Sequence, residues 1–569
     1  MDNTPIIAFR DFGFQYTAQA EPTLYHIDLA VHKGEKILIA GPSGCGKSTL
    51  AHCINGLIPN SYPGKATGSL TIGGKDAFSQ GLFALSKTVG TVLQDSDGQF
   101  IGLTVAEDIA FALENDCVPT QEMHETVQKI ARLVNVEQVL GHAPHEISGG
   151  QKQRVALGGV MVGDVDILLF DEPLANLDPA TGKQAICLID EIQKHTGCAV
   201  IIIEHRVEDV LYRPVDRIVL MEDGRIRFDG SPDALLSTDL LPQGGIREPL
   251  YVTALKYAGV TLTADMRPSY LPELVLSDSQ KAQVRHWFAS QPPAPAQPEK
   301  PVQLQVKNLD FTYSGGHHAL RGISLEVHKG EMLSIVGTNG AGKSTFSKVI
   351  CGFENAQSGT ITLNGLDLNL LSIKERADHI GYVMQNPNQM ISKNQIFDEV
   401  ALGLRNRGVS EEEIRPQVEE TLKICGLYPF RNWPISALSY GQKKRVTIAS
   451  ILVLKPEILL LDEPTAGQDL RHYTEIMDFL CALNRQGITV ILITHDMHLM
   501  LEYTPRAVVF HDGQVIADRS GAEVLNSPDI VAQANLKETS LYHLATACGI
   551  EDSEEFTRRF IAQDREVRK

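Results

Sequence analysis

The sequence of 569 residues has no apolar run long enough to cross a membrane. Its most apolar runs, such as residues 201–203 and 458–461, are of strand length, whereas a spanning helix needs ~20 apolar residues. The amino terminus also lacks the basic region and the long apolar core of a signal peptide. We therefore expect any membrane role to depend on a partner chain.

Cysteine and positive charge are both scarce. The nine cysteines are scattered and form no CxxC pair, which excludes a small disulfide framework and favours a reducing, cytosolic compartment. The 51 Lys+Arg stand against 70 Asp+Glu, so the formal net charge is −19. Because affinity for nucleic-acid backbones comes from clustered Lys and Arg, this balance disfavours a nucleic-acid-binding protein. It leaves room for one local site for a phosphate-bearing small molecule.

The chain is one unit written twice. Residues 41–49 (GPSGCGKST) recur as residues 337–345 (GTNGAGKST), and later matching positions, such as Ser148 and Ser439, are 291 residues apart. Residues 291–301 hold five prolines among eleven residues, which is typical of a semi-extended linker. The length also favours at least two domains. The predicted domains are residues 1–230 and 302–520, with C-terminal tails at 231–290 and 521–569 and a linker at 291–301.

Strand and helix patterns alternate within each half. Continuous apolar runs at residues 166–171 and 457–462 end in an acid, and similar runs cover residues 199–203 and 489–493. Such runs are typical of strands buried on both faces, as in a parallel sheet covered by helices. The acids and histidines that follow lie where open α/β sheets bind ligands, just past the carboxyl ends of the strands. The predicted fold class is therefore α/β.

Each repeated glycine-rich segment matches GxxxxGK[ST] and follows a predicted strand. In this pattern the glycines let backbone amides converge on phosphate oxygens, and a helix that begins at the lysine directs its positive end at the same anion. Lys47 and Lys343 are then expected to reach the β- and γ-phosphates of ATP. Ser48 and Ser344 are expected to place a hydroxyl on Mg²⁺. Two intact copies make an accidental glycine-rich turn a poor explanation.

Each half also carries an Asp-Glu-Pro triplet at the end of an apolar run. We expect Asp171 and Asp462 to hold Mg²⁺, usually through water. Glu172 and Glu463 are expected to polarise the attacking water or to accept its proton. Adjacent acids at a strand end can also form a mere solvated turn, but here the two pairs follow their phosphate loops at similar distances, 124 residues after Lys47 and 119 residues after Lys343.

Further segments resemble the ABC-type ATPases. Residues 147–151 (ISGGQ) and 438–442 (LSYGQ) resemble the LSGGQ signature of that family, and residues 174–178 and 465–469 resemble its D-loops. The resemblance implies two tandem P-loop ATPase domains, each with a mostly parallel sheet core, a helical subdomain and a small C-terminal tail. It also implies glutamine loops, histidine switches and aromatics that stack on adenine: Gln94, Gln385, His205, His495, Tyr16 and Tyr313.

The resemblance implies a head-to-tail sandwich with two composite ATP sites, each built from the phosphate loop of one half and the signature of the other. The implied nucleotide contacts are Tyr16, Gly41, Ser43, Gly44, Gly46, Lys47, Ser48, Thr49, Gln94, Ser148, Gly150, Gln151, Tyr313, Gly337, Asn339, Gly340, Gly342, Lys343, Ser344, Thr345, Gln385, Ser439, Gly441 and Gln442. The implied Mg²⁺ contacts are Ser48, Gln94, Asp171, Ser344, Gln385 and Asp462. The implied catalytic groups are Glu172, His205, Glu463 and His495.

Two departures from the family pattern concern the first composite site. Tyr440 replaces the first glycine of the second signature, and His205 stands in Glu-His-Arg where Thr-His-Asp is commoner. Both halves nevertheless keep the lysine, the acids, the glutamine and the histidine. We expect both sites to hydrolyse ATP, and the departures leave equal turnover open.

Residues 94–100 (QDSDGQF) and 385–390 (QNPNQM) resemble the extended glutamine loop of energy-coupling-factor transporter ATPases. The chain is similar to a fused version of the two ATPase subunits of that family, including ATPases assigned to thiamine-precursor uptake. This implies import of a vitamin, a vitamin precursor or a metal ion. The implied partners are a transmembrane coupling subunit and a small substrate-binding membrane protein, with no nucleic acid. The protein would then be peripheral, on the cytoplasmic side of the cell membrane, with membrane contact through its partners only.

We expect Asp97, Gln99, Asn388 and Gln389 to lie at the contact with the coupling subunit, although these residues can also serve only to shape the loops. Two other functions stay open. A tandem ATPase of another importer, such as a sugar importer, often has a degenerate second phosphate loop, whereas the second loop is intact here. A soluble ABC regulator of ribosomes or DNA would be expected to carry a basic linker or clustered cysteines, which this sequence lacks.

Overall fold

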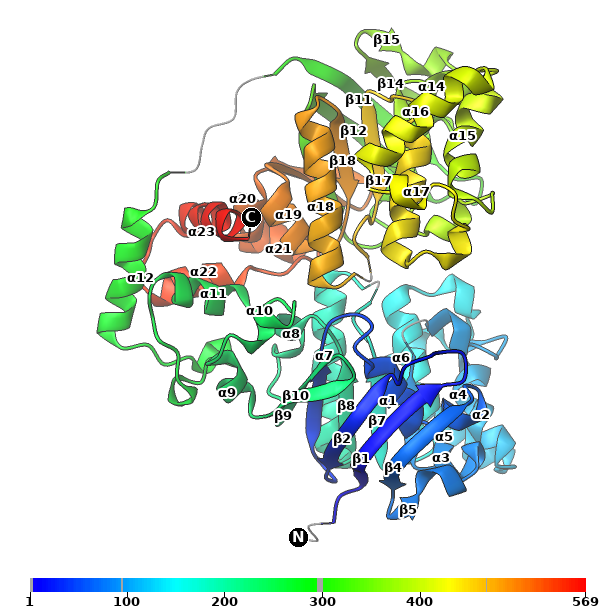
Figure 1. The fold of residues 1–569 in the computed structure, drawn as a ribbon, viewed down its shortest axis with the longest axis vertical. Coiled ribbons are helices and arrows are strands. Elements are labelled where there is room, and N and C mark those ends of the chain that lie inside the picture. Colours follow the sequence, from blue (N-terminus) through cyan, green and yellow to red (C-terminus); the bar gives the residue numbers. More distant parts are fainter. Residues whose placement is uncertain (1–3, 94–95, 176, 294–299, 467, 569) are drawn as a thin grey trace. The chain divides into compact units, whose positions relative to one another are not determined.

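The structure is a computed structural model that describes residues 4–93, 96–175, 177–293, 300–466 and 468–568. The chain forms two compact units, Met1–Ala289 with Ala547–Gly549, and Ser290–Thr546 with Ile550–Lys569. In each unit, sheets are covered by helices (Figure 1), which confirms the predicted α/β class. Strand β10 ends at Gly230 and β20 ends at Arg519, and the predicted domain boundaries at residues 230 and 520 stay a prediction.

The first unit contains a four-stranded antiparallel sheet, β2-β1-β4-β5, and a six-stranded sheet, β10-β9-β3-β8-β7-β6. Five strands of the larger sheet run parallel, and β10 pairs antiparallel with β9. The strands are β1 (Ile7–Tyr16), β2 (Leu24–Val31), β3 (Lys36–Ala40), β4 (Gly64–Ile72), β5 (Lys75–Asp76), β6 (Val89–Val92), β7 (Ile167–Asp171), β8 (Ala199–Ile203), β9 (Arg217–Glu222) and β10 (Arg225–Gly230). The α-helices are α1 (Lys47–Ile54), α2 (Leu57–Asn60), α3 (Leu82–Ser86), α4 (Val105–Asn115), α5 (Thr120–Leu133), α6 (Gly149–Met161), α7 (Pro179–Thr196), α8 (Val207–Val210), α9 (Pro232–Leu236), α10 (Leu240–Gln243), α11 (Leu250–Tyr257) and α12 (Asp278–Ser290).

The second unit repeats this plan, with sheets in the order β12-β11-β14-β15 and β16-β17-β18-β13-β19-β20. Its strands are β11 (Val302–Thr312), β12 (His318–His328), β13 (Met332–Gly337), β14 (Ser358–Leu363), β15 (Leu366–Asp367), β16 (Ile380–Val383), β17 (Ile458–Asp462), β18 (Thr489–Ile493), β19 (Arg506–His511) and β20 (Gln514–Arg519). Its α-helices are α13 (Lys343–Cys351), α14 (Ile373–Arg376), α15 (Ile396–Asn406), α16 (Glu411–Ile424), α17 (Tyr440–Leu452), α18 (Leu470–Arg485), α19 (Met497–Tyr503), α20 (Gly521–Leu525), α21 (Pro528–Gln533), α22 (Ser540–Ala547) and α23 (Ser553–Val567). Among the described residues, no helix combines the length and the apolar character that a membrane crossing requires.

The continuous apolar runs form the central parallel strands, as predicted. Every residue of β3, β8, β13 and β18 is buried. The register aligns their carboxyl ends: Ile493 in β18 pairs both with Ile335 in β13 and with Asp462 in β17. The first unit has the same alignment around Ile203. The phosphate loop, the acid pair and the histidine of each half therefore leave the sheet at one edge.

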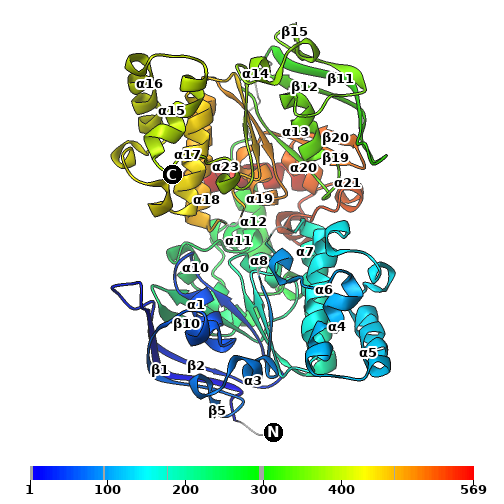
Figure 2. The ribbon, with the colours of Figure 1, turned by 90° about the vertical axis from the view of Figure 1, so that its right-hand side faces the viewer.

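A small group of helices forms a subdomain in each unit. Helices α15, α16 and α17 lie side by side on one flank of the second unit, and α4, α5 and α6 form the matching group in the first (Figure 2). Buried aliphatic side chains such as Val400, Val418 and Ile448 join α15, α16 and α17 into one hydrophobic core. The signature segment begins the last helix of each group, because Ser148 caps α6 and Ser439 caps α17.

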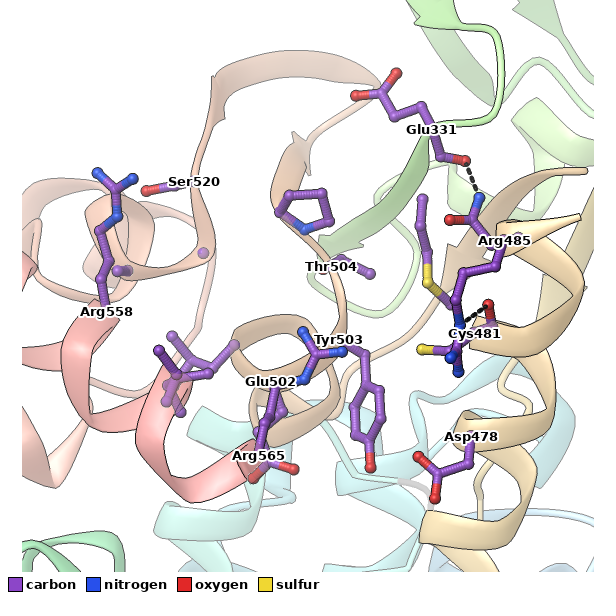
Figure 3. Close-up of a pocket in the computed structure, with 18 of the residues that line it drawn as sticks. Glu331, Asp478, Cys481, Arg485, Glu502, Tyr503, Thr504, Ser520, Arg558 and Arg565 are labelled. Atoms are coloured by element: carbon purple, nitrogen blue, oxygen red, sulfur yellow. Dashed lines mark hydrogen bonds between the residues drawn. The ribbon is translucent and has the colours of Figure 1, made fainter. Parts of the chain in front are cut away.

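The C-terminal tail of the second unit packs against the ATPase core and encloses a pocket of about 1010 Å³ (Figure 3). Glu502, at the end of α19, lies at this pocket with only 2% of its surface exposed. Its carboxylate accepts hydrogen bonds from both terminal nitrogens of Arg568, at 3.1 and 3.2 Å. Arg568 also pairs with the buried Asp564 of α23. One guanidinium group thus joins two buried acids and fastens the last helix to the core.

Arg568→Ala is expected to loosen α23 strongly, because it removes the cation that bridges two buried carboxylates. Removing one partner of a buried pair is strongly destabilising, and since Arg568 is itself partly exposed we expect a loss of about 2–3 kcal/mol. Hydrogen exchange of the α23 amides and the thermal unfolding of the intact chain measure this loss. The control is Arg558→Ala on the same helix, whose ion pairs are half-exposed and for which we expect less than about 0.5 kcal/mol. Equal effects of the two substitutions would contradict the assigned role of Arg568.

Candidate active site

The two phosphate loops connect β3 to α1 and β13 to α13, as the sequence predicts. Gly46 and Gly342 stand directly before these helices with φ of 102° and 98°, which a residue with a side chain rarely adopts. Gly337 has φ of 140°, and a Cβ there would lie 1.9 Å from the carbonyl oxygen of Phe510. Glycine is therefore required at these points for the loop to turn and to pass close to its neighbour.

The lysines of the two loops make matching contacts. The Lys47 ammonium donates to the carbonyls of Gly41 at 2.7 Å and Pro42 at 2.9 Å. The Lys343 ammonium donates to the equivalent carbonyls of Gly337 and Thr338, both at 2.8 Å. Both side chains are buried, so each charge is held inside its own loop. The loop crests are exposed at Ser43, Gly44, Asn339 and Gly340.

A tyrosine from the antiparallel sheet contacts each loop helix. The Tyr16 hydroxyl lies 3.0 Å from the Thr49 hydroxyl, and the Tyr313 hydroxyl lies 3.0 Å from the Thr345 hydroxyl. The structure thus brings both predicted adenine-stacking residues beside the phosphate loops. Stacking itself stays a prediction.

The acid pairs lie at the ends of β7 and β17 and next to the phosphate loops. In the second half the Ser344 hydroxyl donates to the Asp462 carboxylate at 3.2 Å. Burial, together with the adjacent Glu463, raises the pKa of Asp462 above its usual value. Burial and the adjacent Glu172 likewise raise the pKa of Asp171 to about 6. A divalent cation would counter this crowding of negative charge, and hydroxyl and carboxylate oxygens are ligands that Mg²⁺ accepts, so the residues present fit it.

Glu172 and Glu463 adopt a strained backbone conformation at the same position of each half. Their φ angles are 49° and 46°, in the left-handed region that glutamate seldom enters. Such strain persists where the surrounding structure imposes it, and it is concentrated at functional sites. Its occurrence in both halves supports a role for these two glutamates in the chemistry.

The histidines lie beside these glutamates, but differently in the two halves. In the second half His495 Nδ1 is 2.7 Å from Glu463 Oε1. In the first half His205 Nδ1 is 3.8 Å from Glu172 Oε1 and 3.3 Å from Glu204 Oε1. Burial lowers the pKa of His205, but the two neighbouring carboxylates outweigh burial and raise this pKa above its ordinary value. Burial raises the pKa of Glu172, but the contact with His205 outweighs burial and holds this pKa below its ordinary value.

The signature residues cap their helices. The Ser148 hydroxyl accepts from the Gln151 amide and the Gln151 side chain accepts from the Ser148 amide, and Ser439 and Gln442 repeat this exchange. A Cβ on Gly150 would lie 2.5 Å from the Thr181 side chain, whereas Gly441 has ordinary space around it. That the signature of one half faces the phosphate loop of the other stays a prediction.

The second glutamine loop follows β16, and Gln385 is exposed there. Gln94, its predicted counterpart in the first half, lies outside the described residues. Asn176 and Gly467, which belong to the predicted D-loops, also lie outside them.

Comparison with known proteins identifies the family. The sequence profile of the family described as ABC transporter matches residues 24–175 and 320–466, which is more than half of the chain. The chain belongs to the ATP-binding proteins of ABC transporters. Members of this family bind and hydrolyse ATP, and this ABC ATPase is an ATP hydrolase. A second profile, described as ATP-binding cassette cobalt transporter, matches residues 238–311.

Relatives match this ABC ATPase over its whole length. A protein of Enterococcus faecalis is 58% identical over 99% of this chain and 99% of its own, and one of Clostridium perfringens is 55% identical over 100% of both. Both proteins are named ABC transporter ATP-binding proteins, and both names rest on prediction. A solved structure titled cbiO1 from Clostridium perfringens, part of the ABC transporter complex cbiONQ, is 35% identical and covers 43% of this chain and 100% of its own, with a TM-score of 0.39.

Sequence patterns missed three residues at the sites of this ABC ATPase. Lys444 on α17 is buried and donates to the carbonyls of Met384 and Gln385, both at 2.8 Å, so it ties the glutamine loop to the signature helix. Burial lowers its pKa to about 8. The Tyr382 hydroxyl donates to the Asp462 carboxylate at 3.2 Å. Glu204 was visible as an acid at the end of an apolar run, but its contact with His205 was not.

Proposed function

We propose that this ABC ATPase energises a membrane importer of the energy-coupling-factor type, which takes in a vitamin, a vitamin precursor or a metal ion. The observation that carries the proposal is a full set of phosphate-loop lysine, acid pair and histidine in each half of one chain. Two such sets provide two ATP sites. The cobalt-transporter match at residues 238–311 and the resemblance of the extended glutamine loops support the type of importer.

We assign the following roles to the residues of each site. The loop amides and Lys47 or Lys343 bind the phosphates of ATP. Glu172 or Glu463 orients the attacking water and accepts its proton, and His205 or His495 holds that carboxylate in place. Mg²⁺, when bound at Ser48 and Asp171 or at Ser344 and Asp462, offsets the negative charge of the phosphates.

The partners would be a transmembrane coupling subunit and a small substrate-binding membrane protein, which would hold this ABC ATPase at the cytoplasmic face of the cell membrane. Of the residues predicted at the contact, Gln99 is engaged within its own loop, since it accepts from the Leu93 amide at 2.9 Å and donates to the Thr91 carbonyl at 3.1 Å. Asn388 and Gln389 are exposed and available to a partner. The side chain of Asp97 lies outside the described part of the structure.

An exposed apolar pair beside the first glutamine loop favours a docked partner. Ile101 and Leu103 have 64% and 81% of their surface exposed. Exposure of neighbouring apolar side chains to water is unfavourable and is typical of a surface that binds a partner. Their position just before α4 places them between the glutamine loop and the helical subdomain. We therefore assign this segment to the docking surface for the coupling subunit.

Purification of the chain from detergent-solubilised membranes tests the proposal. We expect an integral-membrane protein to co-purify, whereas ribosomes or nucleic acid in its place would overturn the transport function. Leu103→Asp is expected to reduce the recovered membrane partner at least about tenfold, because a charge is costly in an apolar contact, and to leave the ATPase activity of the isolated chain unchanged. The control is Leu370→Asp, at an equally exposed leucine (83%) in the second half. Equal recovery with both variants would contradict the assigned docking surface.

A further inference from the structure

The two histidine switches of this chain differ in the residue that precedes the histidine. The first half has Glu204-His205-Arg206 after β8, and the second has Thr494-His495-Asp496 after β18. Glu204 and Thr494 are both 0% exposed. A buried carboxylate therefore stands in the first half where the second has a hydroxyl. The two halves provide a comparison within one chain.

In the second half, three groups of the histidine switch contact Glu463. The His495 backbone amide donates to Glu463 Oε1 at 3.1 Å, and the His495 ring nitrogen Nδ1 lies 2.7 Å from the same oxygen. The Thr494 hydroxyl donates to the other oxygen, Oε2, at 3.4 Å. Glu463 is thus held by both histidine groups and by the threonine.

In the first half, the backbone amide of the histidine donates to Glu204 and not to the glutamate of the acid pair. The His205 backbone amide donates to Glu204 Oε1 at 3.2 Å, and the Arg206 amide donates to it at 3.3 Å. The His205 ring nitrogen Nδ1 lies 3.3 Å from that oxygen and 3.8 Å from Glu172. The longer distance, 3.8 Å, is the one to Glu172, the glutamate assigned to the reaction. Glu204 therefore takes the backbone amide of His205 and competes with Glu172 for its ring.

The surroundings fix Glu204 in this position. The Arg206 guanidinium lies 3.6 Å from Glu204 Oε1 and also donates to the Leu174 carbonyl, so it supplies a neighbouring positive charge. The other carboxylate oxygen, Oε2, is buried and has no hydrogen-bond partner in the described part of the chain. Leaving such an oxygen unpaired is costly, and a buried acid kept at that cost is expected to have a function.

We infer that Glu204 is a positioning residue that draws His205 partly away from Glu172, so that the site carrying Lys47 hydrolyses ATP more slowly than the site carrying Lys343. The inference rests on the proposed roles of Glu172 and His205. It assigns different rates to two sites that keep the same set of reacting groups. The slow site would hold its ATP while the fast site completes its turnover.

Reciprocal exchange of the two residues tests this. In chains whose second site is silenced by Glu463→Gln, single-turnover cleavage of radiolabelled ATP reports on the first site. We expect Glu204→Thr to raise that rate about fivefold or more and to leave the half-saturating ATP concentration within about twofold. Thr494→Glu, in chains silenced by Glu172→Gln, is expected to lower the rate of the second site by a similar factor. An unchanged or lower rate with Glu204→Thr, or an effect on half-saturation alone, would overturn the inference.

Two further variants keep the outcome interpretable. Glu204→Gln retains the shape of the side chain and removes its charge, so it is expected to raise the rate in the same direction even if Glu204→Thr folds poorly. A failure of Glu204→Gln to raise the rate would count against the inference. The double variant Glu172→Gln/Glu463→Gln tests the proposed function separately. If it kept full turnover, the roles of Glu172 and Glu463 would be wrong, whatever the Glu204 variants show.

Discussion

Glu463→Gln is expected to lower ATP turnover at the second site about 100-fold and the steady-state turnover of the intact chain about fivefold or more. A positioned general base contributes ~10²–10⁴ to a rate, and a neutral amide cannot accept the proton. Glutamine keeps the length of the side chain and an oxygen that can still accept from the His495 amide. We therefore expect ATP binding, measured at equilibrium with radiolabelled ATP, to stay within about twofold of the unaltered chain.

The matched variant in the first half is Glu172→Gln. Since His205 lies nearer to Glu204 than to Glu172, the first site is expected to supply the smaller share of turnover, and its loss is expected to have the smaller effect. Full turnover in the Glu463→Gln chain would contradict the role of Glu463. A larger loss from Glu172→Gln than from Glu463→Gln would show that the first site is the faster one.

The parts of the site that the sequence predicted are those whose chemistry is local. A phosphate loop is set by glycines and a lysine within nine residues, so residues 41–49 and 337–345 could be identified from the sequence alone. The central strands were identifiable for a similar reason, because a strand covered on both faces has to be apolar throughout. The edge at which the loop, the acids and the histidine meet then followed from the parallel arrangement of the strands.

The parts that the sequence did not predict depend on contacts between distant segments. Lys444 is separated by about sixty residues from the carbonyls that it binds, and a lysine on a helix is ordinarily expected at the surface. The Tyr382–Asp462 hydrogen bond spans 80 residues in the same way. The competition of Glu204 with Glu172 depends on distances that differ by only 0.5 Å, from 3.3 to 3.8 Å, which no sequence pattern specifies.

Duplication makes each half a reference for the other. Matching contacts, such as the carbonyl hydrogen bonds of Lys47 and Lys343, show what the two phosphate loops have in common. Contacts that differ mark where the two sites have diverged. Lys444 is one such case, because Gln153 holds the equivalent position in the first half and donates to the Pro173 carbonyl instead. The two halves thus share the contacts of the phosphate-loop lysine and differ in the contacts of Lys444 and of the histidine.

Lys343→Met is expected to lower the affinity of the second site for ATP about 100-fold. Each hydrogen bond to a charged group contributes about 1.5–3 kcal/mol, and the lysine has no substitute in the loop. In this structure the ammonium donates to the Gly337 and Thr338 carbonyls, so the loop is shaped around that charge. Methionine keeps most of the side-chain length and loses both the charge and these hydrogen bonds. The loop would then lose its internal support together with its contact to the phosphates.

Counting bound ATP separates this effect from general damage. Equilibrium binding with radiolabelled ATP and Mg²⁺, at an ATP concentration about tenfold above the normal dissociation constant, is expected to give close to two ATP per unaltered chain and close to one per Lys343→Met or Lys47→Met chain. The control is Lys348→Met, at an exposed lysine of the same helix α13, for which two ATP are expected. Two sites of undiminished affinity in the Lys343→Met chain would show that this lysine does not bind the phosphates. We expect one ATP in each single variant and none in the double variant Lys47→Met/Lys343→Met. This result would show that each half binds its nucleotide chiefly through its own phosphate loop.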